Sequence, residues 1–174
     1  MTKLPYHRQN LATLIQQQAR QQLEEQGAEK LSLRQIARFL AVTPAAVYRH
    51  FPDKASLLAA LRVEITEELA AALRAGVLDS ADATAMLQRM VSNLLAFAAA
   101  HPRAVRFVLT APLAAPQSLT TVLALVNAQR QVTGSPTDTT AVWTLLVGVL
   151  CQLPNPQLTA KWLTTQVLSL LNHE

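Results

Sequence analysis

Apolar residues recur at helical spacing along nearly the whole chain, and no segment alternates apolar and polar residues as a strand would. The first helix is expected from about His7 to Gln26, with Gly27 as its C-terminal stop. A longer helix is expected from Asp53, as its N-cap, to Gly76. The pattern predicts an all-α protein of about nine helices.

Between these two helices, the stretch Ser32–Phe51 predicts two short helices joined by a tight turn. Ser32 and Gln35 have the spacing of a capping box, in which the hydroxyl and the amide side chain would each satisfy a free N–H group at the helix start. Thr43 followed by Pro44 predicts the start of the second helix, because proline is tolerated at the first helical position. This arrangement is typical of a helix-turn-helix.

The second short helix has a composition suited to the major groove of DNA. Val47 and Phe51 are expected to point inward, which leaves small residues at its start and longer polar residues later. Small residues let the backbone approach base edges, while the longer ones reach phosphates. The outward set is Ala45, Ala46, Tyr48, Arg49 and His50.

Five further helices are expected after Gly76. The fifth helix starts at Ser80 or Asp82 and ends near His101-Pro102. The others span Arg103–Thr110, Gln117–Val132 with a stop at Gly134, Thr137–Leu153, and Asn155-Pro156 to about Asn172.

The last two of these helices are apolar nearly all round, which in a chain of 174 residues indicates neighbours from a second copy. The alternative is one core helix and one that is merely apolar at its surface. The predicted homodimer interface comprises Trp143, Val147, Leu150, Trp162, Leu163, Val167 and Leu170.

The positive charge lies at one end of the chain. Up to Arg62 there are nine Lys/Arg against four Asp/Glu, and beyond it six against seven, so the N-terminal third holds the whole net charge of +4. Such asymmetry is expected when one end meets a polyanion such as nucleic acid. Taken alone, it fits an ordinary domain with scattered basic residues equally well.

No catalytic, metal or cofactor site is predicted. A single cysteine, Cys151, excludes intramolecular disulfides and cysteine-based zinc sites, and the four histidines lack metal-ligand spacing. No glycine-rich phosphate loop or serine elbow occurs. No secretory signal pattern opens the chain, and the apolar run Ala141–Leu153 is too short to cross a bilayer. We therefore expect a cytoplasmic protein without membrane contact.

The run I-A-x-x-L-A-V-T-P-A-A-V-Y-R-H-F-x-x-K-x-x-L, from Ile36 to Leu57, resembles the TetR family of bacterial transcriptional regulators. The resemblance implies a helix-turn-helix DNA-binding domain over residues 8–68 and an effector-binding and dimerisation domain over residues 69–174. It further implies a homodimer, nucleoid-associated when bound to DNA, that usually represses from a palindromic operator and is released by a small molecule. The family commonly has glycine where this chain has Ala41. We expect the same turn, slightly strained or reshaped, at a cost of roughly 1 kcal/mol.

Matched to the family's motif, two groups of residues are implied to contact double-stranded DNA. On the base side these are Arg34, Pro44, Ala45, Ala46 and Arg49, and on the phosphate side Ser32, Tyr48, His50 and Lys54. Thr43, which caps the reading helix, belongs to the same predicted DNA-binding set. His50 as a packing or capping residue, and Arg34 as a solvated arginine, remain alternatives.

An effector would bind in an apolar pocket among the fourth to eighth helices. Residues 63–174 hold only thirteen charged side chains, which favours an uncharged or hydrophobic effector. Plain core packing explains each candidate equally well. The candidates are Met86, Met90, Asn93, Phe97, Phe107, Leu125, Gln129 and Trp143. The alternative function is a DNA-binding regulator without a small-molecule effector, controlled by its abundance or by a protein partner. An enzyme or carrier would need a polar constellation that the sequence does not show.

Overall fold

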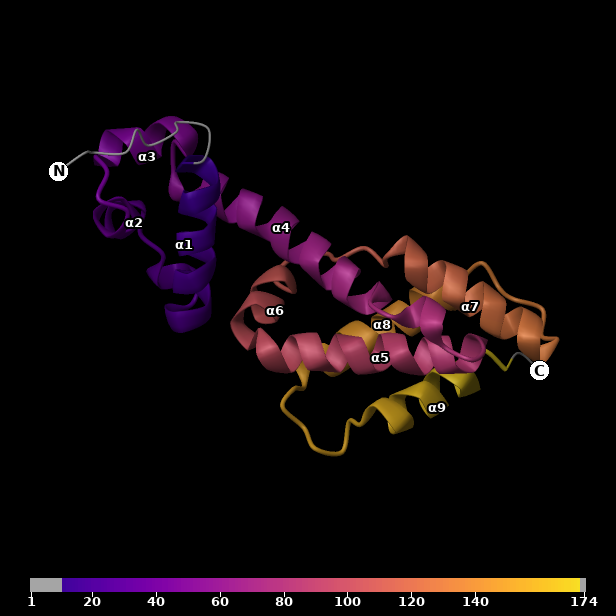
Figure 1. Ribbon diagram of the computed structural model, residues 1–174. Helices are drawn as coiled ribbons and strands as arrows, with labels where there is room; N and C mark the ends of the chain where they lie inside the picture. The colour runs from indigo at the N-terminus through magenta and orange to yellow at the C-terminus, as the bar shows by residue number, and fades with distance from the viewer. Residues whose placement is uncertain (1–10, 173–174) are drawn as a thin grey trace. The chain divides into compact units, whose positions relative to one another are not determined.

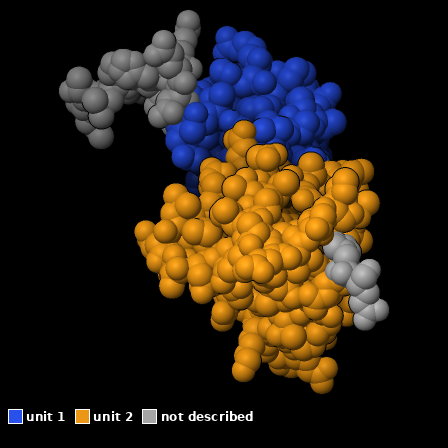
Figure 2. All heavy atoms as spheres, turned by 90° about the vertical axis from the view of Figure 1, so that its right-hand side faces the viewer, with its two compact units in different colours: residues 1–65 blue, residues 66–174 orange. Residues whose placement is uncertain are grey.

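The computed structural model describes residues 11–172, and within them it contains nine α-helices, two short 3-10 helices and no strand (Figure 1). The all-α prediction is confirmed. The chain divides into two compact units, residues 1–65 and 66–174 (Figure 2). The predicted helix start at His7 lies outside the described residues.

The first unit holds α1 (Leu11–Gln26), the 3-10 helix η2 (Ala28–Lys30), α2 (Leu33–Phe39), α3 (Pro44–His50) and the first half of α4 (Lys54–Arg74). α1 packs against η2, α2 and α3, and α2 packs against α3 (Figure 1). Each α-helix of this unit, and Phe51 directly after α3, contributes apolar residues that are almost fully buried. These include Ile15, Leu23, Ile36, Val47, Phe51, Leu57 and Leu61.

The starts of the short helices follow the sequence signals, with one correction. The Ser32 hydroxyl accepts a 3.4 Å hydrogen bond from the Gln35 N–H, and the Thr43 hydroxyl accepts one of 3.3 Å from the Ala46 N–H. The reciprocal half of the predicted capping box is wrong. The Ser32 N–H donates instead to Oε1 of Gln22 on α1, at 3.4 Å. Gln22 is only 5% exposed. A buried amide of α1, and not the Gln35 side chain, therefore supplies the acceptor for the Ser32 N–H group.

The turn of the helix-turn-helix has the expected left-handed residue, with alanine in the position that favours glycine. Ala41 has a φ of 53°. Its N–H donates to the Arg38 carbonyl at 3.2 Å, and the Val42 N–H donates to the Ala37 carbonyl at 3.0 Å. These two bonds make a Schellman motif at the end of α2. The predicted turn is therefore confirmed, and Ala41 bears the strain of its side chain in that conformation.

The second unit holds the end of α4 and five further α-helices. The 3-10 helix η3 (Val77–Asp79) comes first. The five α-helices are α5 (Ala83–Ala100), α6 (Pro102–Val108), α7 (Gln117–Arg130), α8 (Asp138–Cys151) and α9 (Ala160–Leu170). α5 packs against α6, α7 and α9, and α8 packs against α7 and α9 (Figure 1). One core cluster runs through the unit and includes Leu69, Leu73, Leu94, Leu123, Leu146 and Val167.

Of the two starts weighed for the fifth helix, Asp82 is the N-cap, because its carboxylate accepts a 2.8 Å bond from the Ala85 N–H. The last helix starts later than predicted. Asn155 makes a local turn by accepting from the Gln157 N–H at 3.0 Å, and Thr159 then caps α9 by accepting from the Trp162 N–H at 3.2 Å. Asn155-Pro156 therefore lies in the loop before α9.

The end of α7 also differs from prediction. The helix ends at Arg130, and Gln131 takes the left-handed conformation with a φ of 56°. The Val132 N–H bonds back to the Asn127 carbonyl at 3.0 Å, which closes the helix before Gly134 is reached. The predicted stop at Gly134 is thus wrong by one turn.

Candidate nucleic-acid interface

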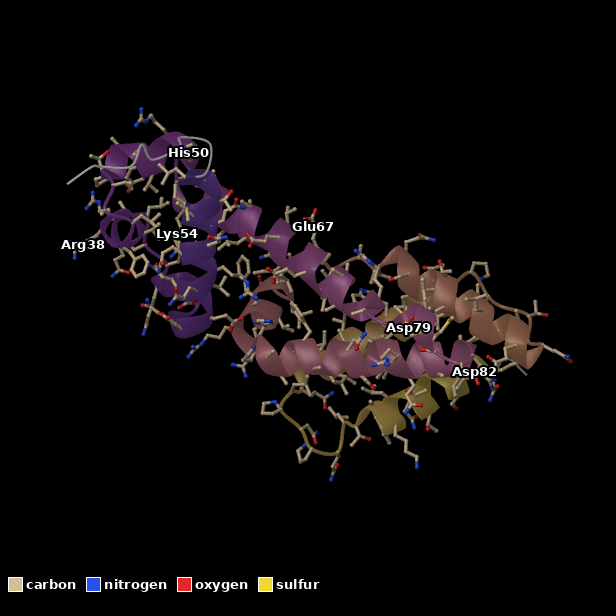
Figure 3. All side chains as sticks on the ribbon, viewed as in Figure 1. Arg38, His50, Lys54, Glu67, Asp79 and Asp82 are labelled. Carbon is tan, nitrogen blue, oxygen red and sulfur yellow. The ribbon has the colours of Figure 1, made fainter. Side chains whose placement is uncertain are left out.

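The surface of α3 combines small residues with longer polar ones. Val47 is fully buried and holds the helix against the core, while Ala45, Tyr48, Arg49 and His50 are exposed. Ala45 and Arg49 are one helical turn apart and so share a face. Figure 3 shows His50 at the C-terminal end of α3. Of the other predicted contacts on this helix, Pro44 is exposed and Ala46 half-buried.

Two exposed arginines lie on α2. Arg34, predicted as a base-side contact, is exposed near the start of the helix, and Arg38 is exposed one turn later on the same face (Figure 3). Arg38 was not among the predicted contacts. Its i, i+4 spacing from Arg34 places both arginines on one face of α2, so Arg38 is a further candidate contact.

Three of the predicted contacts also have roles inside the domain. Ser32 and Thr43 cap α2 and α3 through their hydroxyl groups. The Lys54 ammonium, at the start of α4, donates a 2.5 Å hydrogen bond to the main-chain carbonyl of Glu29 in η2. Figure 3 labels Lys54 within this unit. Contact of these residues with DNA stays a prediction.

Several residues predicted for an effector pocket are held by structural contacts. The Asn93 amide donates to the carbonyls of Leu73 and Ala75, at 3.3 and 2.9 Å, where it caps the end of α4. The Gln129 amide oxygen accepts from the Ala83 and Thr84 N–H groups, at 2.9 and 3.3 Å, where it caps the start of α5.

The other six pocket candidates divide by exposure. Met90 and Trp143 are buried in the core, Met86, Phe97 and Phe107 are half-buried, and Leu125 is 45% exposed. The Trp143 indole N–H donates to the Leu113 carbonyl at 2.7 Å, which ties the loop before α7 to α8.

Two hollows of the second unit bear on the effector prediction. One, of about 300 Å³, is lined by none of the eight candidates; its lining comes from α5, α6, the end of α8 and the loop after it. A shallower groove beside α5 includes Asn93. The pocket residues stay a prediction.

The residues predicted for the dimer interface divide between core and surface. Leu150, Leu163 and Val167 are buried within the unit itself, as is Trp143 at 7% exposure. Val147 is half-buried. Trp162 and Leu170 on α9 are 41% and 44% exposed, so they are the members of the set with apolar surface to offer a partner.

The described residues contain neither a membrane-spanning helix nor a metal-binding cluster. No helix within residues 11–172 combines the length and apolarity needed to cross a bilayer. The same residues hold no group of three or more His, Cys, Asp or Glu side chains placed to bind a metal ion.

Two kinds of sequence similarity bear on the first unit. Residues 15–61 match the family model described as bacterial regulatory proteins, tetR family. The nucleoid occlusion factor SlmA of Marinomonas sp. is 31% identical over 90 residues, which cover 52% of this chain and 46% of that protein. SlmA of Aliivibrio fischeri is 31% identical over 77 residues, covering 44% and 39%. The match therefore spans less than half the length of these curated relatives.

Solved structures extend the similarity along nearly the whole chain. A protein of unknown function from Rhodococcus sp. RHA1 has a TM-score of 0.65 at 26% identity, covering 97% of both chains. A tetR-family regulatory protein from Rhodococcus RHA1 has a TM-score of 0.59 at 20% identity, covering 92% of this chain and 94% of that one. The TetR-family regulator PfmR from Thermus thermophilus has 0.57 at 18%, covering 90% and 96%. Residues 15–61 thus carry the helix-turn-helix of the tetR family model, and nearly the whole chain shares its fold with solved TetR-family regulators.

Proposed function

We propose that this protein is a sequence-specific DNA-binding transcriptional regulator, acting as a repressor and a homodimer on a palindromic operator. The observation that supports this most directly is the exposed face of α3, where Ala45 leaves room for close approach and Arg49 follows one turn later. It lies in the part of the chain that carries the positive charge excess. That combination fits a helix in the major groove of a polyanion.

The side chains divide into two roles on DNA. Arg34 and Arg49 read base edges, and a bidentate arginine–guanine pair discriminates against a wrong base by about 1–3 kcal/mol. Tyr48 and His50 contact phosphates, which fixes the position of α3 without reading sequence. Ala45 and Ala46 lack hydrogen-bonding side chains, so they set the depth of entry and add little discrimination of their own.

The homodimer is proposed from α8 and α9. Trp162 and Leu170 leave apolar area exposed on α9, which a second copy would cover. A two-fold axis repeats the same patch on both subunits. Two α3 helices could then enter successive major grooves, about 34–36 Å apart or a somewhat longer span. The variant Trp162→Glu should shift the sedimentation coefficient to that of a monomer, whereas Lys161→Glu, an exposed neighbour, should leave it unchanged.

Release from DNA is proposed to follow binding of a small, mainly hydrophobic effector in the second unit. α4 is one continuous helix that buries Leu61 in the first part of the chain and Leu69 in the core cluster of the second unit. A ligand that repacks this core would therefore act on a helix whose other end supports the DNA-binding domain. A coupling of about 1–3 kcal/mol lowers affinity for DNA by about 5–150-fold.

Selection of bound sequences from random DNA by the full chain tests the proposal. We expect an enriched palindrome, protected from cleavage as two half-sites. The variant Arg49→Ala should lose the preference at the base position that Arg49 reads, while still binding DNA at low salt. Absence of any sequence preference at low salt would contradict the proposed function. A dimer that binds the palindrome but is stabilised by no ligand would favour a regulator controlled by abundance or by a protein partner.

A further inference from the structure

The cavity of about 300 Å³ in the second unit has an apolar lining with a single charged side chain. Its volume is at the lower end of the range for small-molecule sites. The lining residues come from α5, α6, α8 and the loop that follows α8. They are Leu95, Ala98, Ala99, Pro102, Val105, Arg106, Leu150, Leu153 and Pro154.

Arg106 is the charged member, and its side chain has no hydrogen bond or ion pair with any other residue between 11 and 172. The sequence around it contains no compensating acid. From residue 83 to residue 137 there are four arginines and no aspartate or glutamate. Because the one charged side chain of the lining is a cation, the cavity favours an anion over a cation or a neutral molecule.

We propose that this cavity binds a small amphipathic carboxylate, with its apolar chain against the lining and its carboxylate on Arg106. A guanidinium donates two parallel N–H bonds to a carboxylate, a geometry that an alcohol or an amine does not use. Buried side chains such as Val105 and Leu150 offer the chain a surface from which water is excluded. The ligand class thus has a charged head, unlike the uncharged effector that the composition favours.

Three eight-carbon compounds with different head groups distinguish the contribution of the ligand's apolar chain from that of its charge. Octanoate, octan-1-ol and octylammonium are titrated into the full-length protein, and binding is followed by calorimetry and by the melting temperature. Octanoate should raise the melting temperature, and the increase should continue with the logarithm of its concentration above the Kd. Octan-1-ol should bind about fivefold more weakly, since an exposed ion pair contributes up to about 1 kcal/mol. Octylammonium should bind more weakly still. Equal binding of the three compounds, or binding of none, overturns the proposal.

Variants of single residues locate the site. Arg106→Gln should reduce octanoate affinity about fivefold, to that of octan-1-ol, and leave octan-1-ol binding unchanged. Arg103→Gln, on the same helix but outside the cavity lining, is the matched control and should keep the preference for octanoate. Ala99→Leu fills the cavity from an exposed helix position and should abolish binding of both compounds, whereas Ala100→Leu should not. If Arg103→Gln removes the preference as fully as Arg106→Gln, the head group does not lie on Arg106.

This inference rests on the proposed function only for its consequence on DNA, because the ligand is titrated into free protein. Octanoate binding that leaves operator affinity unchanged supports the site and contradicts the effector part of the proposed function. Operator binding without any octanoate binding contradicts the site and leaves the DNA-binding proposal standing.

Discussion

The ammonium group of Lys54 donates a 2.5 Å hydrogen bond to the main-chain carbonyl of Glu29, twenty-five positions earlier in the chain. The bond joins the first residue of α4 to the 3-10 helix between α1 and α2. An ammonium has three donors, so this bond leaves two for a phosphate. Lys54 therefore combines a role in the domain with its proposed contact to DNA.

Removal of this ammonium should lower both stability and DNA affinity. Lys54→Met should reduce the free energy of unfolding by about 1 kcal/mol, the net contribution of one such hydrogen bond. It should also weaken DNA binding at every sequence and reduce the salt slope by about 1. Urea unfolding and binding across a salt series measure the two effects. Lys30→Met, an exposed cation of the same unit, is the control and should leave unfolding unchanged. Unfolding of Lys54→Met like that of the control would show that the bond to Glu29 adds no stability.

The alanine in the helix-turn-helix turn is a site where one substitution should stabilise the protein. Ala41→Gly relieves a left-handed strain of about 1–2 kcal/mol and adds unfolded-state entropy worth about 0.4–1 kcal/mol. The net gain in the free energy of unfolding should be about 0.5–1 kcal/mol. Ala41→Val should destabilise, because a branched side chain fits a φ of 53° poorly. A glycine variant no more stable than the parent would show that the turn is not strained.

The two proposed kinds of DNA contact should differ in how they respond to sequence. Tyr48→Phe removes a phosphate contact and should weaken binding alike at all sequences. Arg34→Ala should relax the preference at one base position, at a cost of about 1–3 kcal/mol for the preferred base. Arg38→Gln shows whether the second arginine of α2 reads sequence too. Binding to a library of operators with single base changes provides the measurement. If Arg34→Ala lowers DNA affinity equally at all sequences, Arg34 contacts a phosphate and not a base.

Position 134 requires glycine because a buried side-chain amide lies close to it. A Cβ atom at this position would lie 2.8 Å from Nδ2 of Asn127. That nitrogen donates a 2.9 Å bond to the Asp138 carboxylate, and both side chains are only 6% exposed, so the amide has no room to retreat. Gly134→Ala should lower the free energy of unfolding by about 1–3 kcal/mol, the cost of leaving a buried polar group unsatisfied.

Gly148 is the matched control for this substitution. A Cβ atom there meets nothing within 4 Å, and the residue lies inside α8. Gly148→Ala should raise the free energy of unfolding, by up to about 1 kcal/mol, through helix propensity. Thermal and urea unfolding of the two variants should therefore change in opposite directions. A shared direction would show that the Asn127–Asp138 contact does not determine the cost at Gly134.

Signals that act within one turn of the chain were predictable from sequence. Thr43-Pro44 and Asp82 start helices because a side-chain oxygen and the next few N–H groups are local to each other. The left-handed turn at Ala41 was expected from the resemblance, because the family commonly has glycine at that position. Most residues of the proposed DNA interface lie at or between these local features, in the segment that resembles the TetR family.

Bonds between distant segments were not predictable in this way. Asn93 and Gln129 have side chains that would suit a polar pocket, yet they cap the end of α4 and the start of α5, eighteen and more positions away. Arg106 had no local signature beyond its place in a segment without acids. Nothing in the periodicity shows which helix faces meet, and so the lining of the cavity became visible only with the fold.

The bond from the Ser32 N–H to Gln22 limits how the helix-turn-helix can be used outside its own domain. The stretch Ser32–Phe51 is the part that would be transferred to another scaffold to move its DNA specificity. Removed from α1, it would lose the acceptor that satisfies the start of α2. It would also expose Ile36 and Val47, which are fully buried here. The piece to transplant is therefore the whole first unit, residues 1–65, and hybrid regulators should be joined within α4, beyond Ile65, and not at the edges of the motif.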